Sequence, residues 1–403
     1  MRRLSIIAVR NVLRNKRRSL FSAMAMIIGV AFVVFLNGFF NGFIGVVIRE
    51  SVEGRTGALQ IHHRGFLTAQ SDPLKLDMPS DPAFVARIRA VPGVTAIAPR
   101  INFEGLLNNG SVANVIVGLG VDPREEYVVC PWRKGVEVDG SLSPDATDQM
   151  LVGAELAESM ELAPGASVTL LSATQRGASN ALDASVKGRI DSPVPFASKR
   201  SLVVPLAFAQ SLLKMPGRVT EYAVAIERLD DAELVKQRLQ AALGADFEVH
   251  TWDERDTNAA TFVGRLRAIV TLVTSVLFVL MLTFIVNAML AAVYERVREI
   301  GTMLAVGVRR AQVLQMFLVE AMTLGLAASV LGSLLGTAAV LYFGHHGIVL
   351  QPPGTKPATL YPFVSFASLS FAIFVSVAGA VLAALYPAFK ASRLRPVEAL
   401  RAV

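Results

Sequence analysis

Cysteine is almost absent from the sequence, since Cys130 is the only one among 403 residues. A lone thiol cannot form an internal disulfide, so a disulfide-stabilised secreted domain is excluded. We expect Cys130 to be a buried, small apolar residue rather than a reactive one.

Motifs that carry enzyme chemistry are also missing. The sequence has no G-x-x-x-x-G-K-[ST] phosphate loop, so we do not expect it to bind nucleotide in the P-loop manner. Its histidines come as His62-His63, His250 and His345-His346, and neighbours on a strand point to opposite faces, which disfavours a metal site. No Ser, His and Asp arrangement has a catalytic context. We therefore expect no enzyme activity, cofactor or metal in this chain.

Charged residues are scarce, at 18% of the chain, whereas hydrophobic residues make up 53%. With a mean hydropathy of +0.50, the chain is too apolar for a soluble globule of this length. A hydrocarbon core of about 30 Å needs about 20 apolar residues in a helix. Four runs with almost no charge are long enough, at residues 19–48, 268–293, 313–343 and 363–385. We predict four transmembrane helices.

Basic residues lie next to the ends of these runs and predict their orientation. They gather at residues 2–18, 296–310 and 390–401. Because Lys and Arg are retained on the cytoplasmic side, we expect both termini in the cytoplasm and residues 49–267 outside. The formal net charge of +7 is then explained by contact with anionic lipid headgroups, so we expect no nucleic-acid partner.

The segment of residues 49–267 has the composition of a soluble domain, and its patterns predict a mixed α/β extracytoplasmic domain. Asn109-Gly110 favours a two-residue type I′ hairpin turn, and the polar residues 252–267 favour a helical stalk before the second span. The predicted strands are residues 58–62, 106–108, 111–117, 167–171, 202–205 and 222–226, and the predicted helices are 82–90, 154–161 and 231–243.

The connection between the second and third spans is charged at its ends and apolar in its middle. A short helix over residues 299–306 would place Ile300, Met303 and Leu304 on one face, and Gly307 is suited to end it in the left-handed conformation. Such a helix either lies on the lipid headgroups or docks onto a partner protein. The residues alone leave both interpretations open.

Small and polar residues inside the spans predict helix contacts. Gly332 and Gly336 form a G-x-x-x-G spacing, which allows two helix backbones to approach closely. Glu320 lies within the third span, where a carboxylate is costly unless it is paired, and we favour a structural pairing with a basic neighbour over a proton relay. Asn287 is a further intramembrane polar residue.

Three separated motifs resemble a known family. Residues 295–307 resemble the E-R-x-R-E-I-G-x-x-x-A-x-G pattern of the permease subunits of MacB and FtsX-like ABC transporters, the group that includes lipoprotein-releasing Lol permeases. Residues 10–18 are similar to the family's amphipathic N-terminal helix, and residues 386–401 to its closing motif. The outer segments 116–123, 152–157 and 203–206 are similar to the MacB-like periplasmic core.

This resemblance implies a permease of the bacterial inner membrane that works by mechanotransmission. In the family, permeases pair as homo- or heterodimers and a partner ABC ATPase dimer binds ATP and Mg. The substrate would be a lipoprotein or another hydrophobic or periplasmic molecule. The residues expected to couple to the ATPase are Glu299, Ile300, Gly301, Met303, Leu304, Gly307, Arg309 and Arg310.

The resulting fold class is a polytopic α-helical membrane protein with four transmembrane helices and a mixed α/β domain between the first two. The expected parts are a cytoplasmic amphipathic helix (1–18), span one (19–48), the periplasmic domain with its stalk (49–267), span two (268–293), a coupling helix (294–312), span three (313–343), a short periplasmic loop (344–362), span four (363–385) and a cytoplasmic tail (386–403).

One departure from the family concerns a periplasmic carrier. In lipoprotein-releasing permeases a proline-bearing hairpin can dock a soluble carrier, whereas here the corresponding segment is predicted to be a loop, residues 172–184, that contains no proline. Carrier docking, a MacB-like efflux role with a periplasmic adaptor, and an FtsX-like signalling scaffold without transport are therefore kept as alternatives. A secondary transporter is disfavoured because no internal repeat is visible.

Overall fold

The structure is a computed structural model that describes residues 16–66, 73–143, 145–191, 199–350 and 358–393. The expected amphipathic helix before residue 16 and the end of the closing motif after residue 393 lie outside these residues. The chain divides into two compact units. A helical unit holds Met1–Gly45, Val263–Leu350 and Thr359–Val403, and an inserted domain holds Val46–Phe262 with Gln351–Ala358.

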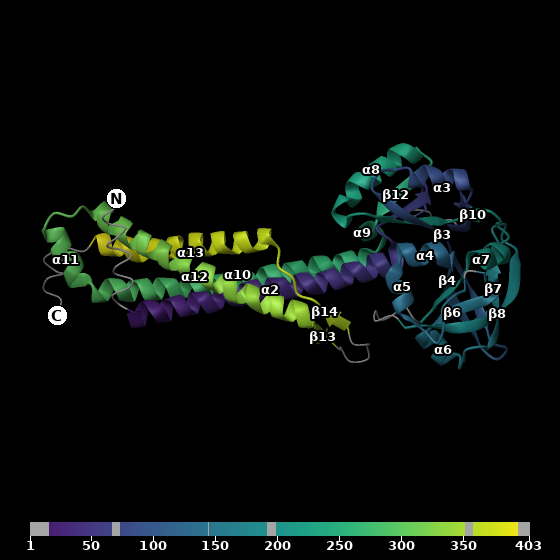
Figure 1. Cartoon of the computed structure of the whole chain (residues 1–403), viewed down its shortest axis with the longest axis horizontal. Helices are drawn as coiled ribbons and strands as arrows, with labels where there is room; N and C mark the ends of the chain where they lie inside the picture. The colour runs from purple at the N-terminus through teal and green to yellow at the C-terminus, as the bar shows by residue number, and fades with distance from the viewer. Residues whose placement is uncertain (1–15, 67–72, 144, 192–198, 351–357, 394–403) are drawn as a thin grey trace. The chain divides into compact units, whose positions relative to one another are not determined.

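Four long helices are apolar enough to cross a membrane (Figure 1). The first three extend beyond both ends of the apolar runs that predicted them, and the fourth begins at Phe366, three residues inside its run, and extends beyond its C-terminal end. The second of them, α10, has 39 residues and begins well before the apolar run at residue 268. The helices are α2 (Lys16–Ser51), α10 (Thr257–Glu295), α12 (Arg310–His346) and α13 (Phe366–Ser392), with the short α11 (Val297–Ala305) between α10 and α12. Strands β13 (Ile348–Leu350) and β14 (Ala358–Leu360) form a small hairpin between α12 and α13.

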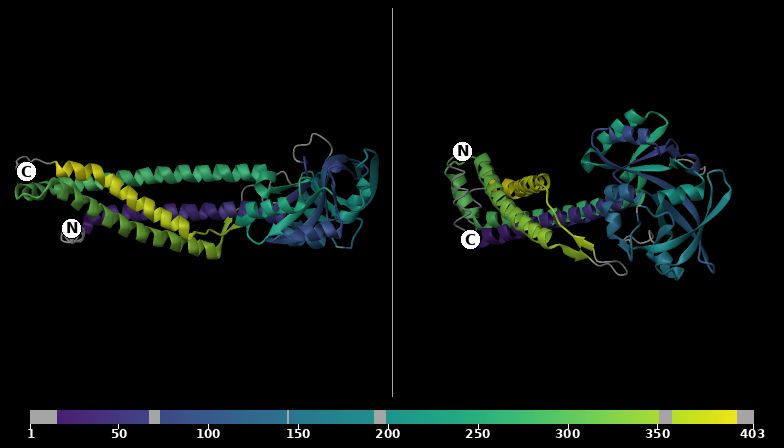
Figure 2. Two further views of the ribbon diagram at one scale, coloured as in Figure 1. Left: turned by 90° about the horizontal axis from the view of Figure 1, so that it is seen from above. Right: turned by 45° about the vertical axis from the view of Figure 1, so that its right-hand side comes forward.

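Glycines on α12 bring this helix close to α2. A Cβ atom added to Gly332 would lie 2.7 Å from the carbonyl oxygen of Ile27, and one added to Gly336 would lie 2.7 Å from that of Ala31. Ala328 is buried one turn earlier on the same face. On another face, α12 packs along α13, where Gly325 approaches Ala380 (Figure 2). The G-x-x-x-G spacing thus lies where α12 and α2 are so close that no side chain fits at these two positions.

The inserted domain is a mixed α/β fold built on one large sheet. In the described residues, ten strands pair in the order β12-β1-β11-β3-β4-β9-β6-β8-β5, with β7 joined to β3 and β8. Its strands are β1 (Leu59–His63), β3 (Val94–Asn108), β4 (Ala113–Val121), β5 (Glu137–Val138), β6 (Gln149–Gly153), β7 (Ser167–Ala173), β8 (Ser179–Ile190), β9 (Ser201–Pro205), β11 (Glu221–Ile226) and β12 (Phe247–Thr251), while β2 (Met78–Pro79) pairs with β10 (Arg218–Val219). The helices are α3 (Pro82–Arg89), α4 (Pro123–Val129), α5 (Pro131–Gly135), α6 (Ala154–Ser159), α7 (Leu206–Leu213), α8 (Ala232–Leu243) and α9 (Trp252–Arg255).

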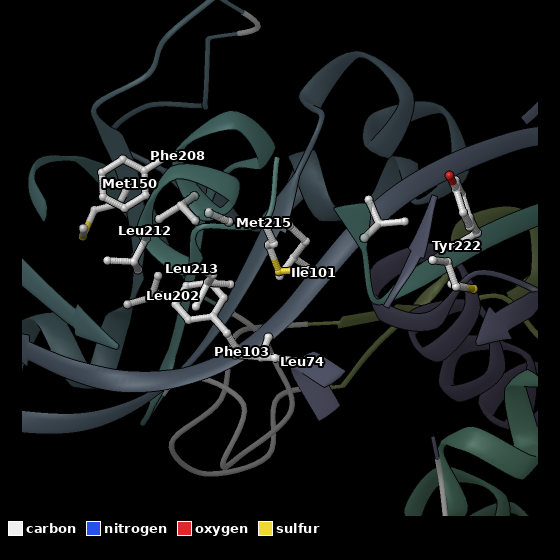
Figure 3. Close-up of a cluster of buried hydrophobic side chains, with 14 of the residues drawn as sticks. Leu74, Ile101, Phe103, Met150, Leu202, Phe208, Leu212, Leu213, Met215 and Tyr222 are labelled. Carbon is white, nitrogen blue, oxygen red and sulfur yellow. The ribbon is translucent and has the colours of Figure 1, made fainter. Parts of the chain in front are cut away.

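One face of this sheet carries the main hydrophobic core. Because side chains alternate along a strand, Ile101 and Phe103 of β3 point to the same face, where they meet Leu202 of β9. Helices α3, α7 and α8 cover this face with their own apolar residues, among them Leu212 of α7 (Figure 3). The domain therefore has its own core.

The opposite face of the sheet is only partly covered, by α4 and α5. Ala98 of β3 and Ala223 of β11 are paired across the two strands, and Val129 and Cys130 pack onto them. Alanine side chains are short, so the α4–α5 segment lies close to the strands. Cys130 has no exposed surface, which confirms the expectation of a buried thiol.

Two sequence predictions about loops are wrong. The hairpin at Asn109-Gly110 exists, but its loop spans residues 109–112, because Asn108 pairs with Ala113. The Asn109 side chain accepts hydrogen bonds from the backbone N–H groups of residues 111 and 112, which stabilises a wider turn than type I′. Residues 172–184 are not a long loop either, because β7 and β8 pair as a hairpin through residue 173.

A matched pair of glycine variants tests the α12 contact. We expect Gly336→Ala to destabilise the protein by about 1–3 kcal/mol, because the new methyl group overlaps backbone of α2. Gly264→Ala on α10 meets no atom within 4 Å and should be neutral or stabilising by up to about 1 kcal/mol. Thermal unfolding in detergent, followed by circular dichroism, measures both. Equal shifts for the two variants would contradict close packing at Gly336.

Candidate functional site

The segment that joins α10 to α12 is held by a buried ion pair. Arg296 lies between α10 and α11, and its Nη1 donates to both carboxylate oxygens of Glu320 on α12 at 3.3 Å. Glu320 is 3% exposed, so the pair is largely removed from solvent. The arginine thus ties the end of α10 to a point inside α12, and Glu320 has the basic partner that the sequence favoured.

Helix α11 turns its apolar face toward the other helices. Ile300 has no exposed surface and packs with Phe317 of α12 and Ala388 of α13. Met303 and Leu304 are half-buried against the same cluster, and Gly301 is buried. Of the three residues on the expected docking face, Ile300 is buried within the chain, whereas Met303 and Leu304 remain partly exposed. In this nine-residue helix, the apolar face packs against the ends of α12 and α13.

Gly307 ends α11 in the way its position predicted, with φ of 98°. The N–H of Gly307 donates to the carbonyl of Leu304 at 3.2 Å, and that of Val308 to the carbonyl of Met303 at 3.0 Å. This pattern satisfies carbonyls that would otherwise be left unpaired at the end of a helix. Arg309 is the N-cap residue of α12, and its N–H donates to the side-chain oxygen of Gln312 at 3.0 Å.

A second face of α11 remains exposed, and we call it the outer face. Val306 at its end is 86% exposed, more than any other large apolar residue in the described part of the chain. Glu299 lies on the same segment and is exposed as well. The outer face consists of Arg298, Thr302, Ala305 and Val306, followed by the exposed Arg309 and Arg310.

Other polar residues of the helical unit differ in their surroundings. Lys390 of α13 donates to the hydroxyl of Tyr294 on α10 at 2.7 Å, and its Nζ lies 5.1 Å from the centre of that ring. This contact joins α10 and α13 next to α11. Asn287 is exposed on α10.

Sequence reasoning missed a buried cluster of charges in the inserted domain. Arg100 of β3 is 1% exposed and binds Glu126 of α4 through two hydrogen bonds, of 2.8 and 2.7 Å. It also binds Glu221 of β11 at 2.9 Å, because the two residues are directly paired across the strands. Arg133 of α5 adds a second cation, 2.9 Å from Glu126, and His62 of β1 lies 3.3 Å from Glu221.

Charge compensation dominates the electrostatics of this cluster. Burial alone raises the pKa of the Glu221 carboxyl, but the His62 hydrogen bond and the Arg100 charge outweigh it and hold the pKa well below its usual range. Burial alone would lower the pKa of Arg100, but the negative charges of Glu126 and Glu221 outweigh burial and raise the pKa above its usual value. Burial raises the pKa of the Cys130 thiol, so this residue stays protonated and unreactive.

The signal for this cluster is present in the sequence but weak. Along residues 96–102, large apolar residues alternate with alanine, arginine and asparagine, and residues 221–226 begin a similar alternation with glutamate. Charges on the small-residue face of a strand indicate a covered polar site. The pairing of the two strands was needed to place the arginine opposite the glutamate.

The fold defines a class: a multi-pass membrane protein with an α/β domain inserted between its first and second spans. Comparisons with known proteins agree. Residues 271–396 match the FtsX-like permease C-terminal family, and residues 19–242 match the MacB-like periplasmic core domain. The chain therefore belongs to the family of permeases that combines these two domains. It is an ABC transporter permease of the LolC, MacB and FtsX type.

Individual relatives cover the chain to different extents. The lipoprotein-releasing system transmembrane protein LolC of Xylella fastidiosa (strain Temecula1 / ATCC 700964) is 25% identical over 408 residues, which cover 96% of each chain. The macrolide export ATP-binding/permease protein MacB of Bordetella avium is 34% identical over 170 residues, 42% of this chain and 25% of that protein. The crystal structure of the periplasmic region of MacB from Actinobacillus actinomycetemcomitans aligns with 52% of this chain and 94% of its own, at 12% identity and a TM-score of 0.36.

Family membership places the chain among multi-pass proteins of the bacterial inner membrane. Members of the family work with ABC ATPase partners, which are generally separate subunits. The inserted domain corresponds to the MacB-like periplasmic core.

Neighbouring glutamates on α4 test the buried charge cluster. Glu126→Gln should destabilise the inserted domain by about 3–5 kcal/mol, because it leaves Arg100 without its main counter-charge. Glu125→Gln removes only an exposed pair with Arg89 and should cost less than about 1 kcal/mol. Cys130 reports on unfolding, since a maleimide dye reacts with it only when the domain opens. If both variants react at the same temperature as the parent protein, the cluster does not stabilise the domain.

Proposed function

We propose that the chain couples ATP hydrolysis by a partner ABC ATPase to movement of its periplasmic domain. The observation that carries this proposal is the outer face of α11, which presents Val306 and several arginines to solvent while the opposite face of α11 is held in the bundle. A small apolar tip with a basic border fits an ATPase groove with an acidic border. Glu299, Ile300, Gly301, Met303, Leu304 and Gly307 then shape and support the coupling segment, and Arg309 and Arg310 lie at its border.

Three contacts support transmission of a force applied to α11. Arg296 and Glu320 tie its start to α12, Ile300 inserts between α12 and α13, and Lys390 ties α13 to α10. A displacement of α11 would therefore move the attached helices with it. Because α10 is one helix from Thr257 to Glu295, we propose that it carries the movement toward the periplasmic domain.

The proposed substrate is a lipoprotein or another hydrophobic molecule. The supporting feature is an apolar cavity of about 540 Å³ between α2, α10 and α13, a volume typical of sites for small ligands. Val33 of α2, Phe278 of α10 and Leu369 of α13 contribute to its lining. Near-complete coverage of LolC also favours lipoprotein release over the MacB-like efflux role, in which an adaptor would take part.

We further propose a second permease subunit, a copy of this chain or a related one, as the partner within the membrane. Exposed Asn287 on α10 supports this, because a polar side chain on the surface of a membrane helix is stabilised by a neighbouring helix. Both termini and α11 are proposed to lie in the cytoplasm, with the inserted domain in the periplasm.

A charge at the tip of α11 tests the ATPase contact. Val306→Glu should weaken the permease–ATPase complex by about two orders of magnitude or more, because a buried unpaired charge costs several kcal/mol. The variant should still fold, since the side chain is 86% exposed. Co-purification with the co-expressed ATPase measures binding. Val128→Glu is the control, because Val128 is 61% exposed in the inserted domain and should leave the complex intact. An intact complex with Val306→Glu would place the ATPase contact elsewhere.

Cysteine labelling in intact cells tests the orientation. Ser172 is unsuitable because it is buried, so the reporter is Ala178→Cys, an exposed position between β7 and β8. In a Cys130→Ala background, a membrane-impermeant maleimide should label Ala178→Cys in intact cells. Thr302→Cys on α11 should react only after the cells are lysed. The reverse pattern would invert the proposed topology.

A further inference from the structure

A second cavity lies entirely within the inserted domain, on the partly covered face of its sheet. Its volume is about 520 Å³, which is within the range of about 300–1,000 Å³ found for small-molecule sites. The paired strands β1, β11, β3, β4 and β9 form its floor, and its walls come from residues 50–56, from α5 and from residues 255–258 at the start of α10. Because the floor changes from polar to apolar across the sheet, the two ends of the cavity differ in chemistry.

The polar end holds groups that lack partners. Gln60 of β1 is 2% exposed, and its Oε1 is buried without a hydrogen bond. The Nε atoms of Arg55 and Arg255 are also buried without hydrogen-bond partners. An unpaired buried polar atom is unfavourable unless a ligand or water satisfies it. These three groups therefore indicate a ligand that accepts hydrogen bonds and also donates one.

Charges at this end favour an anion. Arg100 is neutralised by Glu126 and Glu221, and Arg55 forms an ion pair with Asp256. Arg255, by contrast, has no carboxylate within ion-pair distance among the described residues. Four arginines and three carboxylates line the cavity, and Glu126, which binds Arg100 and Arg133 from behind the lining, balances the fourth charge. The attraction for an anion therefore comes from Arg255 locally and not from a net positive charge.

The other end of the cavity is apolar and open. Leu119 of β4 and Val203 of β9 are paired across the strands, and Val117 is 46% exposed in the next outward-facing position of β4. Val203 and Ile190 of β8 are buried and support this surface from below. The exposed Val117 and the half-buried Leu119, beside the guanidinium of Arg255, match the two halves of an amphiphile.

We propose that this cavity binds an anionic amphiphile of small-molecule size, whose carboxylate or phosphate contacts Arg255 and whose apolar chain lies on Val117 and Leu119. A hydroxyl beside the head group would donate to Gln60. This inference is independent of the ATPase contact, since ligand binding is measured on the chain alone.

Trp132 lines the cavity and provides the readout. The full-length protein carries two tryptophans, so a Trp252→Phe background leaves Trp132 as the only donor for energy transfer. The probe is 11-(dansylamino)undecanoic acid, added to protein in phosphatidylcholine nanodiscs. We expect saturable energy transfer, and weaker binding by about tenfold for Arg255→Gln, because a charge-assisted hydrogen bond is lost. The methyl ester of the probe has no charge, so it should bind the parent protein as weakly as the acid binds the Arg255→Gln variant.

Three controls distinguish binding in this cavity from adsorption elsewhere on the protein or the nanodisc. Arg176→Gln changes an exposed arginine between β7 and β8 and should leave probe binding unchanged. Val117→Ser changes only the apolar end and should also weaken binding of the probe. This second variant keeps the test valid if Arg255→Gln unfolds. Inorganic phosphate at millimolar concentration should not displace the probe. Absence of saturable transfer, equal binding by parent and both cavity variants, or full displacement by phosphate would each overturn the proposal.

Discussion

The inserted domain depends on how one buried guanidinium is satisfied. Arg100 has five N–H donors, and each has an acceptor: two on Glu126, one on Glu221, the sulfur of Cys130 and the carbonyl of Arg55. Burying this charge would be strongly unfavourable without those partners. Since these acceptors come from β11, the α4–α5 segment and the chain just after α2, Arg100 holds all of these parts around one point on β3. The cavity beside it exists because this polar cluster, rather than packed apolar side chains, covers that part of the sheet.

A similar constraint orders the end of the helical unit. Arg296 and Glu320 pair where water is scarce, so neither charge is free to move away from the other. The pair sets where α11 leaves α10, and Ile300 is then carried into the cluster formed by α12 and α13. Gly307 is required next, because its positive φ turns the chain back into α12 within a few residues. These three positions together decide which side of α11 is exposed.

The sequence predicted the parts that depend on local pattern. Long apolar runs, the small residues at Gly332 and Gly336, and the helix-ending role of Gly307 all act through composition or backbone conformation, and each can be read without tertiary contacts. The side to which the apolar face of α11 turns could not be predicted from the sequence. An amphipathic helix has one apolar face whether that face packs in its own bundle or contacts a partner. The Arg100 cluster also depended on strand register, which joins residues more than 100 positions apart. A single asparagine side chain decided the turn at residue 109, which dipeptide preferences do not capture.

Using its apolar face internally has a consequence for how α11 recognises another protein. Only Val306 remains as a large exposed apolar group, so burial of hydrophobic area contributes little to binding through α11. Arg298, Arg309 and Arg310 then gain weight, because charges at the border of an interface raise the association rate and select the partner. Such a contact would be specific and readily reversible when formed through α11 alone. In the pair of permease subunits that we propose, two α11 helices would strengthen the contact, since linked contacts bind more tightly than either does by itself.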